Sequence, residues 1–181
     1  MNYANIKLCD IANGPGVRTS LFVSGCTHRC KGCFNEIAWP FDYGEAFTEE
    51  VEDRLIESVR PEWIDGITLL GGEPLEPLNQ GALVDFLLRF RHELPGKTVW
   101  CFTGWTLEQL LSRQDPVTEQ LLSLVDVLVD GPFVEEQKDI TLRFRGSANQ
   151  RILDMKSTLT EGKPVLWQDQ PVYAAHAFDP T

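Results

Sequence analysis

Basic residues and long apolar runs are both scarce in this chain of 181 residues. Its 16 Lys and Arg residues are outnumbered by 27 Asp and Glu residues, which leaves a formal net charge of −11. Such an acidic chain repels phosphate groups, so we expect neither nucleic acid nor an anionic membrane surface as a partner. No apolar run is long enough to cross a bilayer, and the N-terminus lacks the basic and apolar regions of a signal peptide. The sequence therefore predicts a soluble cytoplasmic protein.

Cysteine is also sparse, yet three of the five cysteines lie within one short segment. Cys26, Cys30 and Cys33 have the spacing C-x3-C-x2-C, whereas Cys9 and Cys101 stand apart from them. In a chain without a signal peptide, such a cluster indicates metal binding rather than a disulfide framework.

In the rest of the sequence, short apolar runs alternate with segments that have the capping residues and spacing of helices. Each apolar run ends in glycine or polar residues, and the runs predict strands over residues 20–24, 66–70, 98–102 and 125–129. Helices are expected over residues 48–60 behind the N-cap Thr48, after Asn79 as a cap, from the Thr106/Gln109 capping box, and from Asp115-Pro116. Continuous apolar strands joined by helices predict an α/β fold with a parallel sheet.

Functional sites of parallel sheets lie at the carboxyl ends of the strands. The four predicted strands end at Gly25-Cys26, Gly71-Gly72-Glu73, Thr103-Gly104 and Asp130-Gly131, and we expect these ends to share one rim. Beyond residue 151, Val165-Leu166-Trp167 is a candidate last strand, and the final dozen residues are expected to be poorly ordered.

Three thiolates on one loop can bind three corners of an iron–sulfur cubane and leave its fourth iron open to another ligand. The alternative is a zinc site completed by His28, Cys9 or Cys101, although zinc ligands usually come as two separated pairs and the sequence has no second pair. If these residues are not zinc ligands, His28 orients the loop or faces solvent, and Cys9 and Cys101 are expected to be small buried hydrophobic residues.

The cysteine motif after the first strand and Gly-Gly-Glu-Pro at residues 71–74 after the second together resemble the radical S-adenosylmethionine superfamily. The resemblance implies a partial (open) β/α barrel with parallel strands. It also implies a [4Fe-4S] cluster on Cys26, Cys30 and Cys33, with S-adenosylmethionine on the open iron.

The same resemblance assigns contacts to the cofactor. Gly71, Gly72 and Glu73 would line the site of the methionine amino group. Most of the superfamily has an aromatic residue just before the third cysteine, but this chain has Gly32 there and Phe34 after Cys33. The adenine is therefore expected around Gly32, Cys33 and Phe34.

A narrower resemblance comes from the remaining motifs. Residues 13–18 and 21–26 are similar to those of the glycyl-radical-enzyme activases. Within that group, Cys-x-His-x-Cys-x-Gly-Cys, Val129-Asp130-Gly131 and residues 145–150 (Arg-Gly-Ser-Ala-Asn-Gln) resemble the activating components of anaerobic ribonucleoside-triphosphate reductases. The likeness covers residues 1–151, which we expect to form the radical enzyme domain, with residues 152–181 as a partly disordered extension.

This resemblance implies reductive cleavage of S-adenosylmethionine, an electron from flavodoxin or ferredoxin, and a glycyl radical on the large component of the reductase. Alternatives are a pyruvate formate-lyase activase, a 7-carboxy-7-deazaguanine synthase type of enzyme, or a zinc-stabilised binding module. Four residues have more than one predicted role. Asp130 helps to bind a cation or shape the site, or serves a turn. Arg18 faces an anionic part of the cofactor or forms a surface salt bridge, and Arg145 and Asn149 contact cofactor or partner, or serve turns and caps.

Overall fold

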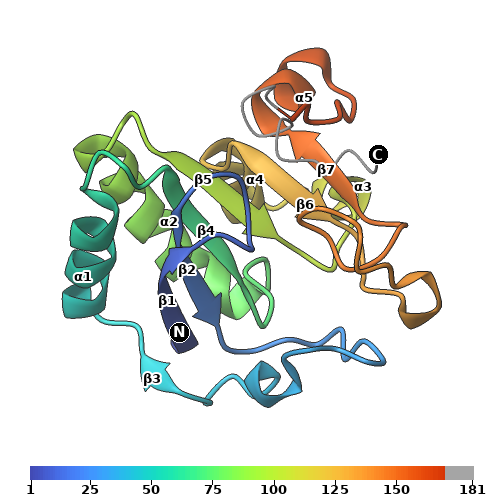
Figure 1. Cartoon of the computed structure of the whole chain (residues 1–181), viewed down its shortest axis with the longest axis horizontal. Coiled ribbons are helices and arrows are strands. Elements are labelled where there is room, and N and C mark those ends of the chain that lie inside the picture. The colour runs from blue at the N-terminus through green and yellow to red at the C-terminus, as the bar shows by residue number, and fades with distance from the viewer. Residues whose placement is uncertain (170–181) are drawn as a thin grey trace, which may run out of the picture.

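One mixed sheet forms the centre of the computed structural model, which describes residues 1–169 (Figure 1). Its seven strands lie in the order β3-β1-β2-β4-β5-β6-β7. The strands are β1 (Asn2–Asp10), β2 (Arg18–Val23), β3 (Glu45–Ala46), β4 (Gly66–Gly71), β5 (Thr98–Phe102), β6 (Val127–Asp130) and β7 (Arg151–Asp154). The helices are α1 (Glu49–Val59), α2 (Pro77–Glu93), α3 (Leu107–Ser112), α4 (Pro116–Ser123) and α5 (Met155–Glu161), with 3-10 turns at Glu36–Ala38 and Glu135–Gln137.

The four central strands are parallel, and the outer strands are not. Strand β2 pairs with β4 from Arg18 opposite Gly66 to Val23 opposite Gly71, and β4, β5 and β6 continue in parallel. The sequence predicted these four strands and their parallel arrangement, and both are confirmed. Strands β1, β3 and β7 are antiparallel to their neighbours, so an all-parallel sheet is wrong. Only residues 11–17 join β1 to β2, whereas a parallel crossover needs a dozen residues or more.

Alternate residues of the central strands face two different apolar clusters. On β5, Val99 and Cys101 belong to the main core, to which helices α1 to α4 contribute buried leucine, isoleucine, valine and phenylalanine side chains. Trp100 points the other way, into a smaller cluster with Phe144 and Trp167 at ring distances of 5.4 and 5.1 Å. The helices therefore cover one face of the sheet, and aromatic side chains from later loops cover part of the other.

The residues that directly follow 151 are part of this sheet. The predicted boundary between residues 151 and 152 falls inside β7, which pairs with β6 along its whole length. The candidate strand at residues 165–167 forms a single bridge, from Leu153 to Leu166, together with a hydrogen bond from the Trp167 N–H to the Ile152 carbonyl. The predicted disorder of the final dozen residues lies outside the described residues.

Helix starts follow the predicted caps at three positions and depart from them at the fourth. The Thr106/Gln109 capping box is present, and the Asp115 carboxylate accepts from the first turn of α4. Thr48 is the N-cap of α1 without a side-chain capping bond. Asn79 does not cap α2, because the helix begins at Pro77 and the buried Asn79 amide donates to the Ser24 and Glu73 carbonyls instead. Within residues 1–169, no helix is both long and apolar enough to span a bilayer.

Close contact between β4 and β5 gives a test of this packing. A Cβ added at Gly66 would lie 1.9 Å from the Thr98 carbonyl oxygen, whereas one added at Gly81 in α2 meets nothing within 4 Å. We expect Gly66→Ala to lower the free energy of unfolding by about 1–3 kcal/mol through overpacking. Gly81→Ala should raise it by about 0.5–1 kcal/mol through helix propensity. Urea unfolding of both iron-free variants measures this, and equal stabilities would contradict the strand contact.

Candidate functional site

A cavity of about 440 Å³ opens at the carboxyl ends of the parallel strands. The residues that follow β2, β4, β5 and β6 all line it, which confirms that the four strand ends share one rim. All eight residues that the sequence predicted as ligands or cofactor contacts lie in this lining: Cys26, Cys30, Gly32, Cys33, Phe34, Gly71, Gly72 and Glu73. Three of the five cysteines thus meet in one cavity, and Cys9 and Cys101 are not part of its lining.

The cysteine loop (residues 25–35) is held where it leaves β2. The Gly25 and Cys26 N–H groups donate to the carbonyls of Ala38 and Trp39, at 2.8 and 3.0 Å. Gly25 has a φ of +93°, and a Cβ at this position would lie 2.2 Å from the Phe41 ring. The glycine before the first cysteine therefore allows a left-handed backbone conformation and a close approach to Phe41.

The glycines after β4 bring that strand end directly against the start of the cysteine loop. The Gly72 N–H donates to the Val23 carbonyl at 2.7 Å, and the Glu73 N–H donates to the Gly25 carbonyl at 2.8 Å. A Cβ on Gly72 would lie 2.6 Å from the Gly25 oxygen. The missing side chains thus allow backbone pairing of β2 and β4 to continue past both strand ends.

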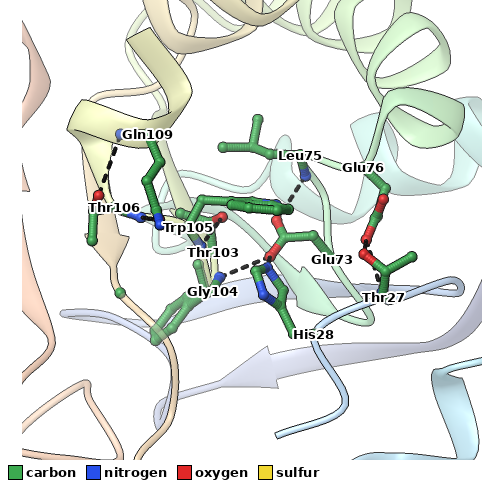
Figure 2. Close-up of polar contacts among 12 residues, drawn as sticks. Thr27, His28, Glu73, Leu75, Glu76, Thr103, Gly104, Trp105, Thr106 and Gln109 are labelled. Atoms are coloured by element: carbon green, nitrogen blue, oxygen red, sulfur yellow. Dashed lines mark hydrogen bonds and ion pairs between the residues drawn. The ribbon is translucent and has the colours of Figure 1, made fainter. Parts of the chain in front are cut away.

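Glu73 connects three segments of the site (Figure 2). Its side chain is buried, and one carboxylate oxygen accepts from the Leu75 N–H at 2.8 Å. The other oxygen accepts from the Gly104 N–H at 2.7 Å and contacts His28 Nε2 at 3.0 Å. The His28 ring packs on Trp105 with centroids 4.5 Å apart. His28 therefore orients the cysteine loop, which is one of the two roles that the sequence predicted for it.

A second buried carboxylate binds the same loop, and the sequence did not identify it. Oε1 of Glu76 accepts from both the backbone N–H and the hydroxyl of Thr27, at 2.8 and 2.5 Å (Figure 2). The two residues are 49 positions apart in the chain. Its nearness to the Gly-Gly-Glu segment is the only local signal that points to Glu76.

Backbone N–H groups lie near the loop thiols. The Asn35 N–H donates to Cys33 Sγ at 3.4 Å, and the main-chain groups of His28 and Phe133 act to lower the pKa of Cys26 and of Cys30. Burial, reinforced by the nearby Glu73 carboxylate, raises the pKa of the Cys26 thiol to about 11. Burial also raises the pKa of Cys30. In the absence of metal Cys26 is therefore protonated at neutral pH, and a metal bound there would displace its proton.

These features fit an iron–sulfur cluster. All five cysteines are free thiols, and the three that line the cavity present sulfur atoms on one loop, the donor type that such clusters use. Backbone donors to those sulfurs are the kind of contact that tunes such clusters. Among residues 1–169, no group of three His, Cys, Asp or Glu side chains is gathered around a single-ion position.

The loop between β6 and β7 forms the opposite wall of the cavity. It is joined to the cysteine loop by an ion pair between Lys31 and Glu135, at 2.9 Å. The sequence missed most of this wall, which contributes Phe133, Lys138, Asp139, Ile140, Leu142 and Phe144. Arg145 lines the cavity while it donates to the Gln150 carbonyl, and Asn149 donates to the Pro132 carbonyl. Both side chains thus stabilise the turn, in agreement with one of their predicted roles.

Arg18 and Asp130, for which the sequence left more than one role, do not line the cavity. Arg18 is 1% exposed, and its guanidinium donates to the Thr68 and Thr98 hydroxyls and to main-chain carbonyls. It is therefore neither a surface salt bridge nor a residue of the lining. Asp130 is buried, accepts from the Leu107 N–H at the start of α3 and pairs with Arg151 on β7. Asp130 therefore connects the end of β6 to the start of α3 and to β7.

The two isolated cysteines differ in their surroundings. Cys101 is fully buried in the core as predicted, and burial raises its pKa well above the usual value for a thiol. Cys9 is exposed, so its predicted burial is wrong. It lies at an irregularity in the pairing of β1 with β2 and has a φ of +53°, because the chain bends there toward the loop that follows.

That loop reaches the cavity through Ala12 and Asn13, and Asp10 anchors it. The Asp10 carboxylate accepts from the Ala12 N–H and from the side chains of Lys7, Asn13 and Ser20. Burial alone would raise its pKa, but these hydrogen bonds outweigh it and lower the pKa to about 2, from 3.8.

The comparisons with known proteins agree with this site. A family model described as a 4Fe-4S single cluster domain matches residues 12–153. The protein named anaerobic ribonucleoside-triphosphate reductase-activating protein in Vibrio cholerae is 44% identical over 154 residues, covering 84% of this chain and 97% of the relative. Proteins of the same name are 44% identical in Escherichia coli K12, over 83% of this chain and 96% of the relative, and 36% identical in enterobacteria phage T4, over 84% and 93%.

The fold and the thiol cavity first define a 4Fe-4S single cluster protein, since the matched segment includes all three cavity cysteines and the whole parallel sheet. Within that class, the chain belongs to the family of anaerobic ribonucleoside-triphosphate reductase-activating proteins. The narrow resemblance seen in the sequence is therefore confirmed. The zinc module, the pyruvate formate-lyase activase and the deazaguanine synthase alternatives are not favoured.

The ionised Asp10 gives a pH dependence that can be measured. Because the folded pKa lies below the unfolded value of 3.8, its stabilisation is present above pH 4 and is lost as the pH falls through 2. Asp10→Asn should remove about 2 kcal/mol of this acid-dependent change in the free energy of unfolding. Urea unfolding of iron-free protein at pH 7, 4 and 2.5 checks it. An acid sensitivity equal to that of the unaltered protein would reject the role of Asp10.

The three cavity cysteines should behave differently from Cys9 on metal loading. After anaerobic reconstitution we expect about four irons per chain in the unaltered protein. Cys26→Ala, Cys30→Ala and Cys33→Ala should each lose most of that iron, because a three-ligand site cannot spare a thiolate. Cys9→Ala should retain it, and iron analysis with visible absorption provides the measurement. Full loading of any of the three cavity variants would show that the ligand set is wrong.

Proposed function

We propose that this protein activates anaerobic ribonucleoside-triphosphate reductase by cleaving S-adenosylmethionine reductively and generating a glycyl radical on the large component of the reductase. One observation carries the proposal. Three free thiols and the Gly71-Gly72-Glu73 segment meet in one cavity, in a chain 44% identical to activating proteins of that name over most of its length. The sheet and its one-sided helical cover are compatible with a partial β/α barrel of the radical S-adenosylmethionine type.

Cys26, Cys30 and Cys33 would hold a [4Fe-4S] cluster, whose fourth iron has no cysteine available in the cavity lining. When bound and reduced, the cluster supplies one electron to the sulfonium of S-adenosylmethionine, which gives methionine and a 5′-deoxyadenosyl radical. The protein contributes placement of the cofactor and exclusion of water. The reaction requires no acid–base pair.

The neighbouring backbone would bind the two ends of the cofactor. Gly71 and Gly72 present main-chain groups without side chains in the way, and the Glu73 carboxylate is available to a cationic amino group beside its present donors. Gly32, Cys33 and Phe34 would pack near the adenine. Phe34 lines the cavity and is 82% exposed, so its ring can cover a bound ligand at the mouth.

The reaction needs two protein partners. A small one-electron donor of the flavodoxin or ferredoxin class would reduce the cluster, in the cytoplasm. The reductase would present a glycine Cα at the cavity mouth, where its hydrogen is transferred to the 5′-deoxyadenosyl radical. Residues 1–151 would carry this chemistry, with residues 152–181 as an extension.

Anaerobic turnover tests the proposal. The reconstituted protein is incubated with dithionite, S-adenosylmethionine and the reductase large component. We expect 5′-deoxyadenosine and methionine in equal amounts, and a glycyl radical signal on the reductase by electron spin resonance. The control is a reductase in which the acceptor glycine is replaced by alanine, which should abolish the glycyl signal. Absence of both 5′-deoxyadenosine and the radical signal with the unaltered pair would reject the function.

A further inference from the structure

The start of helix α2 departs from the usual capping chemistry. Glu76 occupies the N-cap position, where Ser, Thr, Asp or Asn is preferred because a short side chain can accept from the first turn. Its side chain makes no capping bond to its own helix. Departures from local rules in a well-packed protein concentrate at functional sites.

The Glu76 side chain is 5% exposed and extends to the cysteine loop instead. It accepts both the backbone N–H and the hydroxyl of Thr27, the residue next to Cys26. A buried carboxylate is costly unless it is hydrogen-bonded, and these two donors satisfy one of its oxygens. The contact therefore fixes the main chain of the loop as well as the Thr27 side chain.

Neighbouring contacts make this part of the loop unusually constrained. The Cys26 N–H is bound to the Trp39 carbonyl, and His28 is bound to Glu73. Glu76 binds Thr27 between them, so Cys26, Thr27 and His28 each have a hydrogen bond to a residue outside the loop. Figure 2 shows the two carboxylates reaching the loop from the same side. Cys26 is thus fixed through its own N–H group and through the residue that follows it.

We infer that Glu76 is a positioning residue for the cluster: acting through Thr27, it fixes Cys26 and places a buried negative charge beside the metal site. The inference rests on the proposed function, because it assumes that the loop carries the cluster. Partners of metal ligands commonly change affinity or activity by about 10–100-fold when they are removed. The charge around a cluster and the hydrogen bonds to it also set its reduction potential.

Four variants of the reconstituted protein separate the contributions. Glu76→Gln removes the charge but keeps an oxygen that can accept from Thr27. Glu76→Ala removes both, and Thr27→Val removes only the hydroxyl donor. Glu62→Gln is the matched control, because Glu62 is an exposed residue before β4, at the opposite end of the parallel strands from the cavity. Iron content, cluster midpoint potential and the rate of 5′-deoxyadenosine formation per cluster are measured for each.

We expect Glu76→Ala to reduce the rate per loaded cluster at least tenfold, and Glu76→Gln to recover most of it. Glu76→Gln should favour the reduced cluster by up to about tenfold, equivalent to about 59 mV for one electron. Thr27→Val should show a smaller loss than Glu76→Ala, and the double variant should be no worse than Glu76→Ala alone, because the two residues act through one contact. Glu62→Gln should match the unaltered protein in every measurement.

A purely structural role predicts a different result. In that case Glu76→Ala would lower iron occupancy or the melting temperature, while potential and rate per loaded cluster stay unchanged, and the inference would be overturned. If Glu76→Ala fails to load, unchanged potential and rate in both Glu76→Gln and Thr27→Val overturn it equally. Failure of the unaltered protein to cleave S-adenosylmethionine would reject the proposed function, a result distinct from any difference among the variants.

Discussion

The site depends on backbone pairing that continues past the ends of β2 and β4. Hydrogen bonds from the Gly72 and Glu73 N–H groups to the Val23 and Gly25 carbonyls carry the sheet register into two loops. A side chain at residue 72 would collide with the Gly25 carbonyl oxygen, so only glycine permits the approach. Because of this pairing, the Glu73 carboxylate is close enough to bind His28 and Gly104 together. The cysteine loop therefore takes its position from the sheet rather than from its own sequence.

Two buried carboxylates beside three thiols require compensation, since a buried charge without partners is strongly unfavourable. Here the partners are mostly main-chain donors: the Leu75, Gly104 and Thr27 N–H groups, with the Thr27 hydroxyl. Main-chain donors are charge-neutral, so they satisfy the carboxylates without adding a charge to the site. The Glu73 charge also disfavours thiolates in the cavity, consistent with the raised pKa of Cys26, whose main cause is burial.

The sequence predicted those features that depend on local residue patterns. Strand β5 was predicted with its observed bounds because Thr98 is followed by four apolar residues, three of them buried. The three cysteines were found because their spacing lies within one loop. Strand β1 was missed because most of its residues are partly or fully exposed and show no regular alternation. Glu76 was not identified and Asn79 was wrongly assigned as a helix cap, since Thr27 and the Ser24 carbonyl, which they bind, lie on the cysteine loop or just before it, far away in sequence.

The amino end of α2 shows which constraint prevails when local and distant contacts compete. Glu76 and Asn79 are both polar residues that could cap the helix, yet their side chains bind Thr27 and the Ser24 and Glu73 carbonyls. A missing cap costs about 1 kcal/mol, which a helix of 17 residues with buried leucine and phenylalanine side chains can tolerate. A loop that lost these anchors would lose its position relative to the sheet. The first turn of α2 is therefore arranged to support the cysteine loop, and packing against the core maintains the helix.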